Sequence, residues 1–161
     1  MTATITITNP ILSGMYPDPS WIWDDEFQRI VLVTSTFELV PGLPIYVSED
    51  MTCWKHVSNV IDADLARRLL IPFVDDSGGV YAPTLRRIHG KYVIACTIAR
   101  LDDRRAMEGG CTESELMRFH AAEGNFILEA DSIEGPWRGP FWIEGAEGID
   151  PDISEDGDGH V

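Results

Sequence analysis

Short runs of β-branched and aromatic residues recur along the chain, separated by clusters of turn-forming residues. A run of this kind, bounded by Gly, Pro, Asn or Asp, predicts a β-strand. We therefore expect strands over residues 29–37, 45–50, 91–99 and 125–131. The sequence PGLP at 41–44 is expected to break the chain between the first two runs, and the His89-Gly90 pair is expected to form a turn leading into the third.

Two stretches have the pattern of helices. One covers residues 62–73 (DADLARRLLIPF), and the other covers 112–124 (TESELMRFHAAEG). In the second, Thr112 is placed to cap the helix N-terminus, with Glu115 three residues later and Gly124 as a stop. Both stretches lie between predicted strands, so we interpret them as insertions in a fold built from strands.

A sequence repeat organises the chain. The segments PDPSWIW, YAPTLRR and IDPDISED share an x-Pro step, and the aligned residues Asp18, Ala82 and Asp150 are 64 and 68 positions apart. After each of the first two steps come a hairpin, a further strand carrying an acid, and a closing tryptophan. These tryptophans, Trp54 and Trp137, are expected to belong to the core rather than to bind substrate.

A four-stranded unit repeated in this way predicts the blades of a β-propeller, an all-β fold. The first blade is expected at about 14–61, the second at about 78–143 and the start of a third at about 146–161. Trp21 and Trp23 belong to the first blade, and we expect at least one of them to pack between blades. Because a propeller needs about four to eight blades, residues 1–161 are interpreted as a single, truncated domain fragment, an incomplete propeller of about two and a half blades.

The first repeat start places one carboxylate between two prolines. Pro17 and Pro19 fix their own φ and favour extended backbone in the residue before them, so Asp18 is expected in a stiff, extended conformation. The innermost strand of each propeller blade lines the central channel. Asp18 and Asp150 are therefore expected to meet across one pocket. An Asp before Pro is also a common turn former, and spacing alone leaves that alternative open.

Charge and composition narrow the classes of partner. The formal net charge is −15 and the sequence pI is about 4.4, which disfavours nucleic acid and anionic membrane as partners but not neutral sugars. Hydrophobic residues make up 44% and mean hydropathy is −0.06, as in ordinary globular proteins. The N-terminal sequence has no signal-peptide pattern. This favours a cytoplasmic location, with secretion left open should a leader precede these residues.

Cysteine and histidine spacing gives no metal pattern, so we expect no metal and no cofactor. Three cysteines without CxxC spacing, Cys53, Cys96 and Cys111, are interpreted as structural thiols. The acidic segment DPDISEDGDG does not fit a calcium loop, because the sixth and twelfth positions of that loop would be Glu155 and Val161. Its EDGDG part is instead expected to be a tight hairpin turn.

Five motifs in order resemble glycoside hydrolase family 43, and most closely its β-xylosidase and α-L-arabinofuranosidase members. They are NPILSGMYPDPSWIW, TSTFELVPGLPIYVSEDMTCW, GGVYAPTLRRIHGKYVIACT, GNFILEADSIEGPW and EGIDPDISEDGDG. The similarity is weakest over 62–77 and 100–123. The resemblance implies the N-terminal portion of a five-bladed propeller that inverts the anomeric centre, using three carboxylates in its channel.

The resemblance also assigns roles to residues. It makes Asp18 the general base and Asp150 the carboxylate that orients the general acid and modulates its pKa. Phe37 and Tyr81 become aromatic groups of the sugar subsite, with Tyr81 standing where the family usually has Trp. Arg86 is a weaker candidate for a polar role beside the channel.

The general acid of the family is a Glu of the next blade. By position, Glu144, Glu147 and Glu155 do not match it. We therefore expect a glycosidase acting on xylosidic or arabinofuranosidic bonds of hemicellulose-derived oligosaccharides. Residues 1–161 alone are expected to be inactive without the C-terminal blades of the domain. The alternatives are a non-catalytic sugar-binding module and an interaction scaffold built on the same blades.

Overall fold

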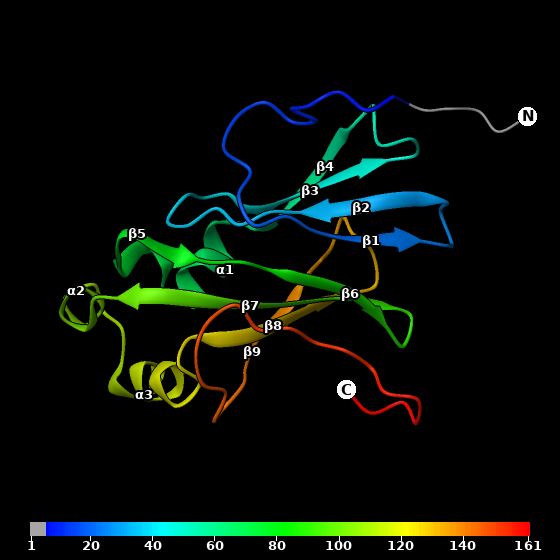
Figure 1. Ribbon diagram of the computed structural model, residues 1–161. Coiled ribbons are helices and arrows are strands. Elements are labelled where there is room, and N and C mark those ends of the chain that lie inside the picture. Colours follow the sequence, from blue (N-terminus) through cyan, green and yellow to red (C-terminus); the bar gives the residue numbers. More distant parts are fainter. Residues whose placement is uncertain (1–5) are drawn as a thin grey trace, which may run out of the picture.

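The computed structural model describes residues 6–161 and contains two antiparallel β-sheets that share one core (Figure 1). The first sheet holds four strands in chain order: β1 (Ser20–Asp24), β2 (Arg29–Val33), β3 (Gly42–Ser48) and β4 (Lys55–Ile61). The second sheet has the order β5-β7-β8-β9, with β6 also paired to β7. Its strands are β5 (Val74–Val80), β6 (Thr84–Ile88), β7 (Lys91–Leu101), β8 (Asn125–Ala130) and β9 (Arg138–Trp142).

The helices lie in the connections between strands. They are α1 (Ala63–Arg68), a 3₁₀ turn (Ile71–Phe73), α2 (Asp103–Glu108) and α3 (Glu113–Ala121). The helices predicted within 62–73 and 112–124 are confirmed, whereas α2 was not predicted. Helices α2 and α3 lie together at one end of the second sheet (Figure 1). None of the helices in the described part of the chain is long and apolar enough to cross a membrane.

The prediction that PGLP breaks the chain between two strands is wrong. Strand β3 begins at Gly42 and includes Pro44, which pairs with Asn59 of β4. The pairing of β3 with β2 covers only the later residues, from Ile45 to Ser48. On the β2 side Pro44 therefore lies at a free strand edge, where its missing N–H costs no ladder hydrogen bond.

The turn predicted at His89-Gly90 is confirmed. Ile88 of β6 pairs with Lys91 of β7, which leaves a two-residue loop between them. Both loop residues have positive φ, 49° at His89 and 78° at Gly90. This is the backbone that a type I′ hairpin turn requires.

The core lies between the two sheets and is built from β-branched and aromatic side chains. Its fully buried members come from both sheets and include Val31, Val33, Leu43, Ile45, Leu85, Ile94, Phe126 and Leu128. Burying this apolar surface is the main stabilising contribution to the fold. It also fixes β1 against β6, so the starts of the two sheets lie side by side.

A buried ionic network also joins the two sheets. The Asp24 side chain is fully buried, and its carboxylate contacts the guanidinium of Arg87 on β6 at 3.0 Å. It also accepts a short hydrogen bond from the hydroxyl of Tyr92 on β7. Arg29 of β2 approaches the same carboxylate at 3.7 Å, and Arg87 reaches Glu26 as well. A buried charge is tolerated only when it is paired and hydrogen-bonded, as Asp24 is here.

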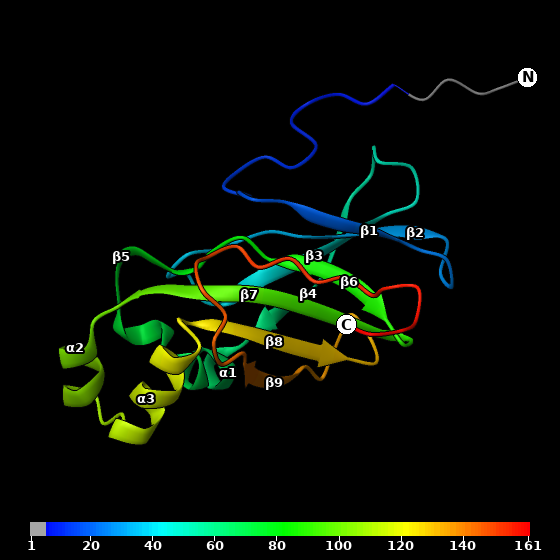
Figure 2. The same ribbon diagram turned by 60° about the horizontal axis from the view of Figure 1, so that its bottom comes forward.

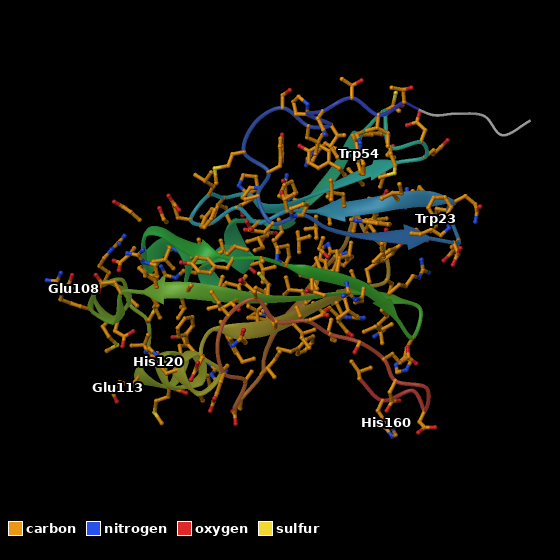
Figure 3. All side chains as sticks on the ribbon, viewed as in Figure 1. Trp23, Trp54, Glu108, Glu113, His120 and His160 are labelled. Atoms are coloured by element: carbon orange, nitrogen blue, oxygen red, sulfur yellow. The ribbon has the colours of Figure 1, made fainter. Side chains whose placement is uncertain are left out.

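Four tryptophans bear on the predictions of packing in the core or between blades: Trp21, Trp23, Trp54 and Trp137. Trp21 and Trp23 are 57% and 44% exposed, so neither packs between the two sheets described, and packing of one of them against another blade stays a prediction. Ile22, between them, packs against the core, so both indoles lie on the opposite face of β1. Trp137 packs against the core as predicted, whereas Trp54 is half-buried and lies outside the core cluster. Figure 3 shows Trp23 on β1 and Trp54 beside the first sheet, just before β4.

Strand β6 lies between the start of the first sheet and the C-terminal segment. On one side, the backbone N–H of Leu85 donates to the hydroxyl of Ser20 at 2.9 Å. On the other side, Arg86 forms a 2.7 Å salt bridge with Asp152. Figure 2 shows the C-terminal segment running beside β6 and β7. The three x-Pro segments are thus neighbours in space, although residues 143–161 contain no strand and the proposed blade limits stay a prediction.

Candidate active site

Asp18 lies two residues before β1, and Ser35 holds it through the Pro17 carbonyl and the Asp18 side chain. The backbone N–H of Ser35 donates to the Pro17 carbonyl at 3.1 Å, and its hydroxyl donates to Oδ2 of Asp18 at 2.7 Å. The φ of Asp18 is +51°, so the expectation of an extended backbone is wrong. Asp tolerates the left-handed region better than most residues, and the two bonds from buried Ser35 stabilise it there.

Phe37, in the connection after β2, and Tyr81, in the connection after β5, lie against each other. Phe37 exchanges two 2.9 Å backbone hydrogen bonds with Val80, which precedes Tyr81. The two rings meet edge to face, with centroids 5.7 Å apart. Close approach of the backbones needs Gly79, where an added Cβ would lie 2.4 Å from the Phe37 carbonyl oxygen. A half-buried aromatic pair is thus fixed at the junction of the two sheets.

Asp150 reaches the same junction from the C-terminal segment. Its Oδ1 accepts a hydrogen bond from the backbone N–H of Ala82 at 3.3 Å. Its φ is +58°, close to the +51° of Asp18, so the two Asp-Pro steps aligned by the sequence repeat share the same left-handed backbone. Non-glycine residues in this conformation cluster at functional sites, where the surrounding structure holds them.

Cys96 of β7 is fully buried next to Tyr81. Burial raises the pKa of its thiol well above the usual range, and the charges of Asp150 and Asp18 add to that rise. The thiol itself is in contact with the carbonyl of Tyr81 at 3.3 Å. The thiol contacts Tyr81 and the next residue, Ala82, binds Asp150, so Cys96 lies close to the Asp150 side of the site. That Asp18 and Asp150 face one pocket stays a prediction.

Arg86 reaches the C-terminal segment. Its salt bridge with Asp152 uses one guanidinium nitrogen, and another donates to the carbonyl of Leu85 at 2.9 Å. The side chain of Arg86 is 36% exposed, and that of Asp152 is 71% exposed. The pair therefore ties the segment that follows Asp150 to β6.

Sequence reasoning missed three buried polar residues around the site. Ser35 holds Asp18, whereas Thr97 and Asn125 hydrogen-bond each other beneath the Asp150 segment. All three are at most 2% exposed. The sequence signal that could have found them is a hydroxyl or amide residue inside or beside a strongly apolar strand. Such a residue is expected to be buried, and a buried polar group needs a hydrogen-bond partner.

Exposed acids near the C-terminus form a small cluster. Asp156, Asp158 and His160 have potential ligand atoms within 4.8 Å of one another. Asp156 already accepts hydrogen bonds from the backbone N–H groups of Asp158 and His160, both at 2.9 Å, and these bonds lower its pKa. The expected EDGDG turn is present, but no strands flank it in the described chain, so it is not a hairpin. These internal bonds account for the cluster as a turn.

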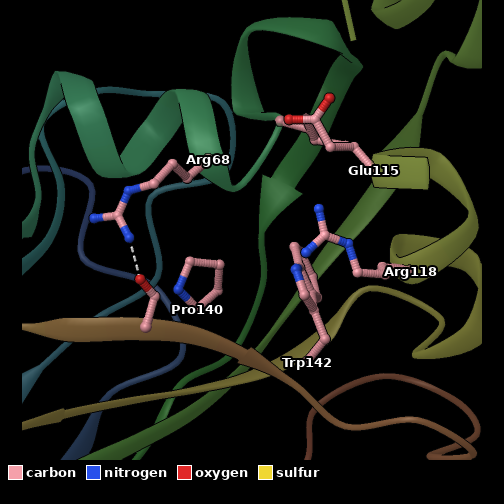
Figure 4. Close-up of a pocket in the computed structure, with 7 residues that line it drawn as sticks. Arg68, Glu115, Arg118, Pro140 and Trp142 are labelled. Atoms are coloured by element: carbon pink, nitrogen blue, oxygen red, sulfur yellow. Dashed lines mark hydrogen bonds between the residues drawn. The ribbon is translucent and has the colours of Figure 1, made fainter. Parts of the chain in front are cut away.

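A hollow of about 300 Å³ lies elsewhere, between α1, α3 and β9 (Figure 4). Arg68, Glu115, Arg118 and Trp142 are among its lining residues, and Arg68 donates to the carbonyl of Gly139. Glu115 belongs to the capping box of α3, whose Thr112 donors lower its pKa. The lining contains none of the five residues assigned from the sequence, so this hollow is separate from the candidate active site.

Comparison with known proteins agrees with this architecture. The model of "Glycosyl hydrolases family 43" matches residues 7–161. A xylan 1,3-beta-xylosidase of a Vibrio species is 35% identical over 158 residues, covering 97% of this chain and 26% of that protein. A non-reducing end alpha-L-arabinofuranosidase of Bacteroides ovatus is 35% identical over 150 residues, covering 92% of this chain and 24% of that protein.

The solved structures include a xylan beta-1,4-xylosidase from Bacillus halodurans C-125. It superposes with a TM-score of 0.72 at 30% identity, over 96% of this chain and 26% of that one. The chain thus spans about a quarter of the length of the relatives it matches. Its two sheets correspond to part of a five-bladed propeller, as the sequence predicted. From the family match and this fold, the chain belongs to glycoside hydrolase family 43.

Proposed function

We propose that the protein containing these residues hydrolyses xylosidic or arabinofuranosidic bonds in hemicellulose-derived oligosaccharides, with inversion at the anomeric carbon. The observation that supports this proposal most directly is that the two Asp-Pro steps share the same left-handed backbone, with Asp18 held by the Ser35 hydroxyl and Asp150 by the Ala82 N–H. The names of the relatives support the substrate class, since they include xylosidases and an arabinofuranosidase.

In this proposal Asp18 is the general base. An inverting glycosidase needs a carboxylate to activate water on one face of the sugar, and a carboxylic acid roughly 6.5–9.5 Å away to protonate the leaving oxygen. The hydrogen bond from Ser35 holds Oδ2 of Asp18, while the Asp18 residue itself is exposed. Oδ1 is then the oxygen available to the attacking water, in a direction set by the Ser35 bond.

Asp150 is proposed to act on the general acid rather than on the water. A fixed negative charge raises the pKa of a neighbouring carboxyl group and keeps it protonated for donation. The Ala82 N–H and the left-handed backbone fix the direction of the Asp150 side chain. Phe37 and Tyr81 offer aromatic surface to the apolar face of a sugar ring. Arg86 is proposed to help through Asp152, beside the channel.

The proton donor is proposed to be a glutamate of a further blade, supplied by the part of the relatives' length that these residues do not span. Residues 1–161 alone are then expected to bind little substrate and to release no product. The substrate is an oligosaccharide, and the C-terminal blades of the same domain complete the channel wall.

The test uses 4-nitrophenyl β-xyloside and 4-nitrophenyl α-arabinofuranoside with the complete enzyme and with the 161-residue chain. The complete enzyme should release 4-nitrophenol, and Asp18→Asn should lower kcat by at least about a thousandfold, as expected for loss of an essential base. Glu38→Gln, an exposed acid near Phe37, is the matched control and should keep activity. Turnover by the 161-residue chain that depends on Asp18 would contradict the assignment of the acid. Binding of xylobiose by the complete enzyme without turnover would indicate a sugar-binding module instead.

A further inference from the structure

The segment between β9 and Asp150 has no strand ladder to hold it. Residues 143–150 leave the sheet after Trp142 and turn back toward Ala82. Backbone bonds anchor its first part, from Ile143 to the Asn125 carbonyl at 3.0 Å and from Gly145 to the Ala121 carbonyl at 2.9 Å. The later part, immediately before Asp150, depends on side chains.

Asn125 supplies the buried part of that support. Its side-chain amide donates to the carbonyl of Gly148 at 3.0 Å and reaches the carbonyl of Ala146 at 3.5 Å. The residue is 2% exposed. A second contact comes from the exposed Glu123, which accepts the Gly148 N–H at 3.1 Å. Because a water-exposed hydrogen bond contributes little to stability, the buried amide is the main restraint on the segment from Ala146 to Gly148, which ends two residues before Asp150.

Thr97 orients that amide. Its hydroxyl donates to Oδ1 of Asn125 at 2.5 Å, and Thr97 is fully buried. With the oxygen of the amide engaged by this donor, the NH₂ group of Asn125 faces the Ala146 and Gly148 carbonyls. The carbonyl of the same Thr97 accepts the backbone N–H of Tyr81 at 3.0 Å. Thr97 of β7 therefore binds both Asn125, which holds the segment before Asp150, and Tyr81 of the aromatic pair.

We infer that Thr97 and Asn125 are positioning residues for Asp150: a buried hydroxyl–amide pair that fixes the Asp150 segment relative to Tyr81. This inference rests on the proposed function for its catalytic meaning. Its structural content stands separately, since it concerns which contacts hold Asp150 against Ala82. Both side chains are buried, so they act through the segment they hold and not as exposed groups of the site.

Two neighbouring amides report on the pair in the 161-residue chain. The Tyr81 N–H bonds to the backbone of Thr97, whereas the Ala82 N–H bonds to the side chain of Asp150. Thr97→Val keeps the shape and removes the hydroxyl. We expect hydrogen exchange at Ala82 to quicken by about tenfold while Tyr81 is unchanged, as for local opening without global unfolding. Thr97→Ser, which keeps the hydroxyl, should restore slow exchange at Ala82.

The complete enzyme carries the second readout. Thr97→Val should lower kcat for the 4-nitrophenyl glycoside by about tenfold with little change in KM, because a misplaced group costs rate more than binding. Asn125→Ser should behave in the same way, and Thr97→Ser should retain at least about half of the rate. A purely structural role would speed exchange at Tyr81 and Ala82 alike, and that outcome would overturn the inference. Unchanged exchange at Ala82 in Thr97→Val would overturn it as well.

The two proposals fail in different ways. Full activity of Asp18→Asn would remove the proposed function and leave the exchange pattern at Ala82 to be judged by itself. Normal loss of activity in Asp18→Asn, together with an unaffected kcat in Thr97→Val, would keep the function and reject the positioning role.

Discussion

The hydroxyl of Ser35 donates a 2.7 Å hydrogen bond to Oδ2 of Asp18, across 17 positions of sequence. The donor is fully buried and the acceptor belongs to an exposed residue, so the bond anchors an exposed carboxylate to the core. The backbone of Ser35 also binds Pro17, which gives the Asp-Pro step two attachments to the same residue. Asp18 is held by a contact distant in sequence as much as by its flanking prolines.

Ser35→Ala should lower kcat of the complete enzyme by about tenfold, because Asp18 loses the bond that directs it at the attacking water. Stability should change by no more than about 1 kcal/mol, since exposed Asp18 can be hydrated after the hydroxyl is removed. Parallel measurements of 4-nitrophenol release and urea unfolding check both parts. Ser13→Ala, at an exposed serine, is the control. A Ser35→Ala enzyme with full kcat would show that the bond plays no part in orientation.

Gly79→Ala should destabilise the fold by more than about 2 kcal/mol, combining strained backbone with a clash. The φ at Gly79 is +91°, and an added Cβ would lie 2.4 Å from the Phe37 carbonyl oxygen. The matched control is Gly90→Ala, which has a φ of +78° but nothing within 4 Å of the new Cβ. Gly90→Ala should lower the free energy of unfolding by about 1 kcal/mol, the cost of the left-handed backbone alone. Urea unfolding measures the free energy of unfolding of both variants. An equal decrease in the two would mean that the backbone at Phe37 and Val80 shifts to accommodate the added Cβ at little cost.

The sequence was sufficient for features that depend on local pattern and repeat. The His89-Gly90 turn, the capped helix α3 and the strands β7 and β8 follow from residue types a few positions apart. The repeat also predicts that Asp18 and Asp150 face one channel, because equivalent blade starts in a propeller face one axis, and this stays a prediction.

Features that depend on distant partners could not be derived in this way. The local effect of two prolines favours extended backbone at Asp18, and it is overridden by the bonds from Ser35. The PGLP segment joins a strand because β4 pairs with it while β2 does not. The exposure of Trp21 and Trp23 depends on which face of β1 meets the second sheet. The alternation of side chains along the strand separates the two faces but does not identify the one that is buried.

Thr112→Ala should lower the free energy of unfolding by about 1 kcal/mol at pH 7, the usual cost of a lost N-cap. The Thr112 N–H and hydroxyl both donate to Glu115, and these bonds lower the pKa of Glu115 below its ordinary 4.5. A carboxyl with a lowered folded pKa adds stability above its unfolded pKa and loses it as pH falls. The gap between Thr112→Ala and the parent should therefore narrow below about pH 4.5. Thermal unfolding from pH 3 to 7 measures it, with Ser114→Ala of the same helix as control; a pH-independent gap would exclude the Glu115 contribution.

Tyr92→Phe should weaken the link between the two sheets and flatten the alkaline limb of stability. Buried Asp24 loses a hydroxyl donor, which should cost about 2 kcal/mol at pH 7, as for a hydrogen bond to a charged group. Burial, followed by the bond to Asp24, raises the pKa of Tyr92 from 10.0 to about 12.

The sign of the alkaline effect follows from that rise. Below pH 10 the phenol is protonated in both states, so its full stabilising contribution is present. Between about pH 10 and 12 the unfolded chain loses the proton while the folded chain keeps it, so stability falls as pH rises. Tyr92→Phe removes this share of the decline, whereas Tyr81→Phe, with an exposed hydroxyl, should leave it intact. Urea unfolding at pH 9, 10, 11 and 12 compares the slopes. Parallel slopes in Tyr92→Phe and the parent would mean that the proton on Tyr92 is not retained by the Asp24 network.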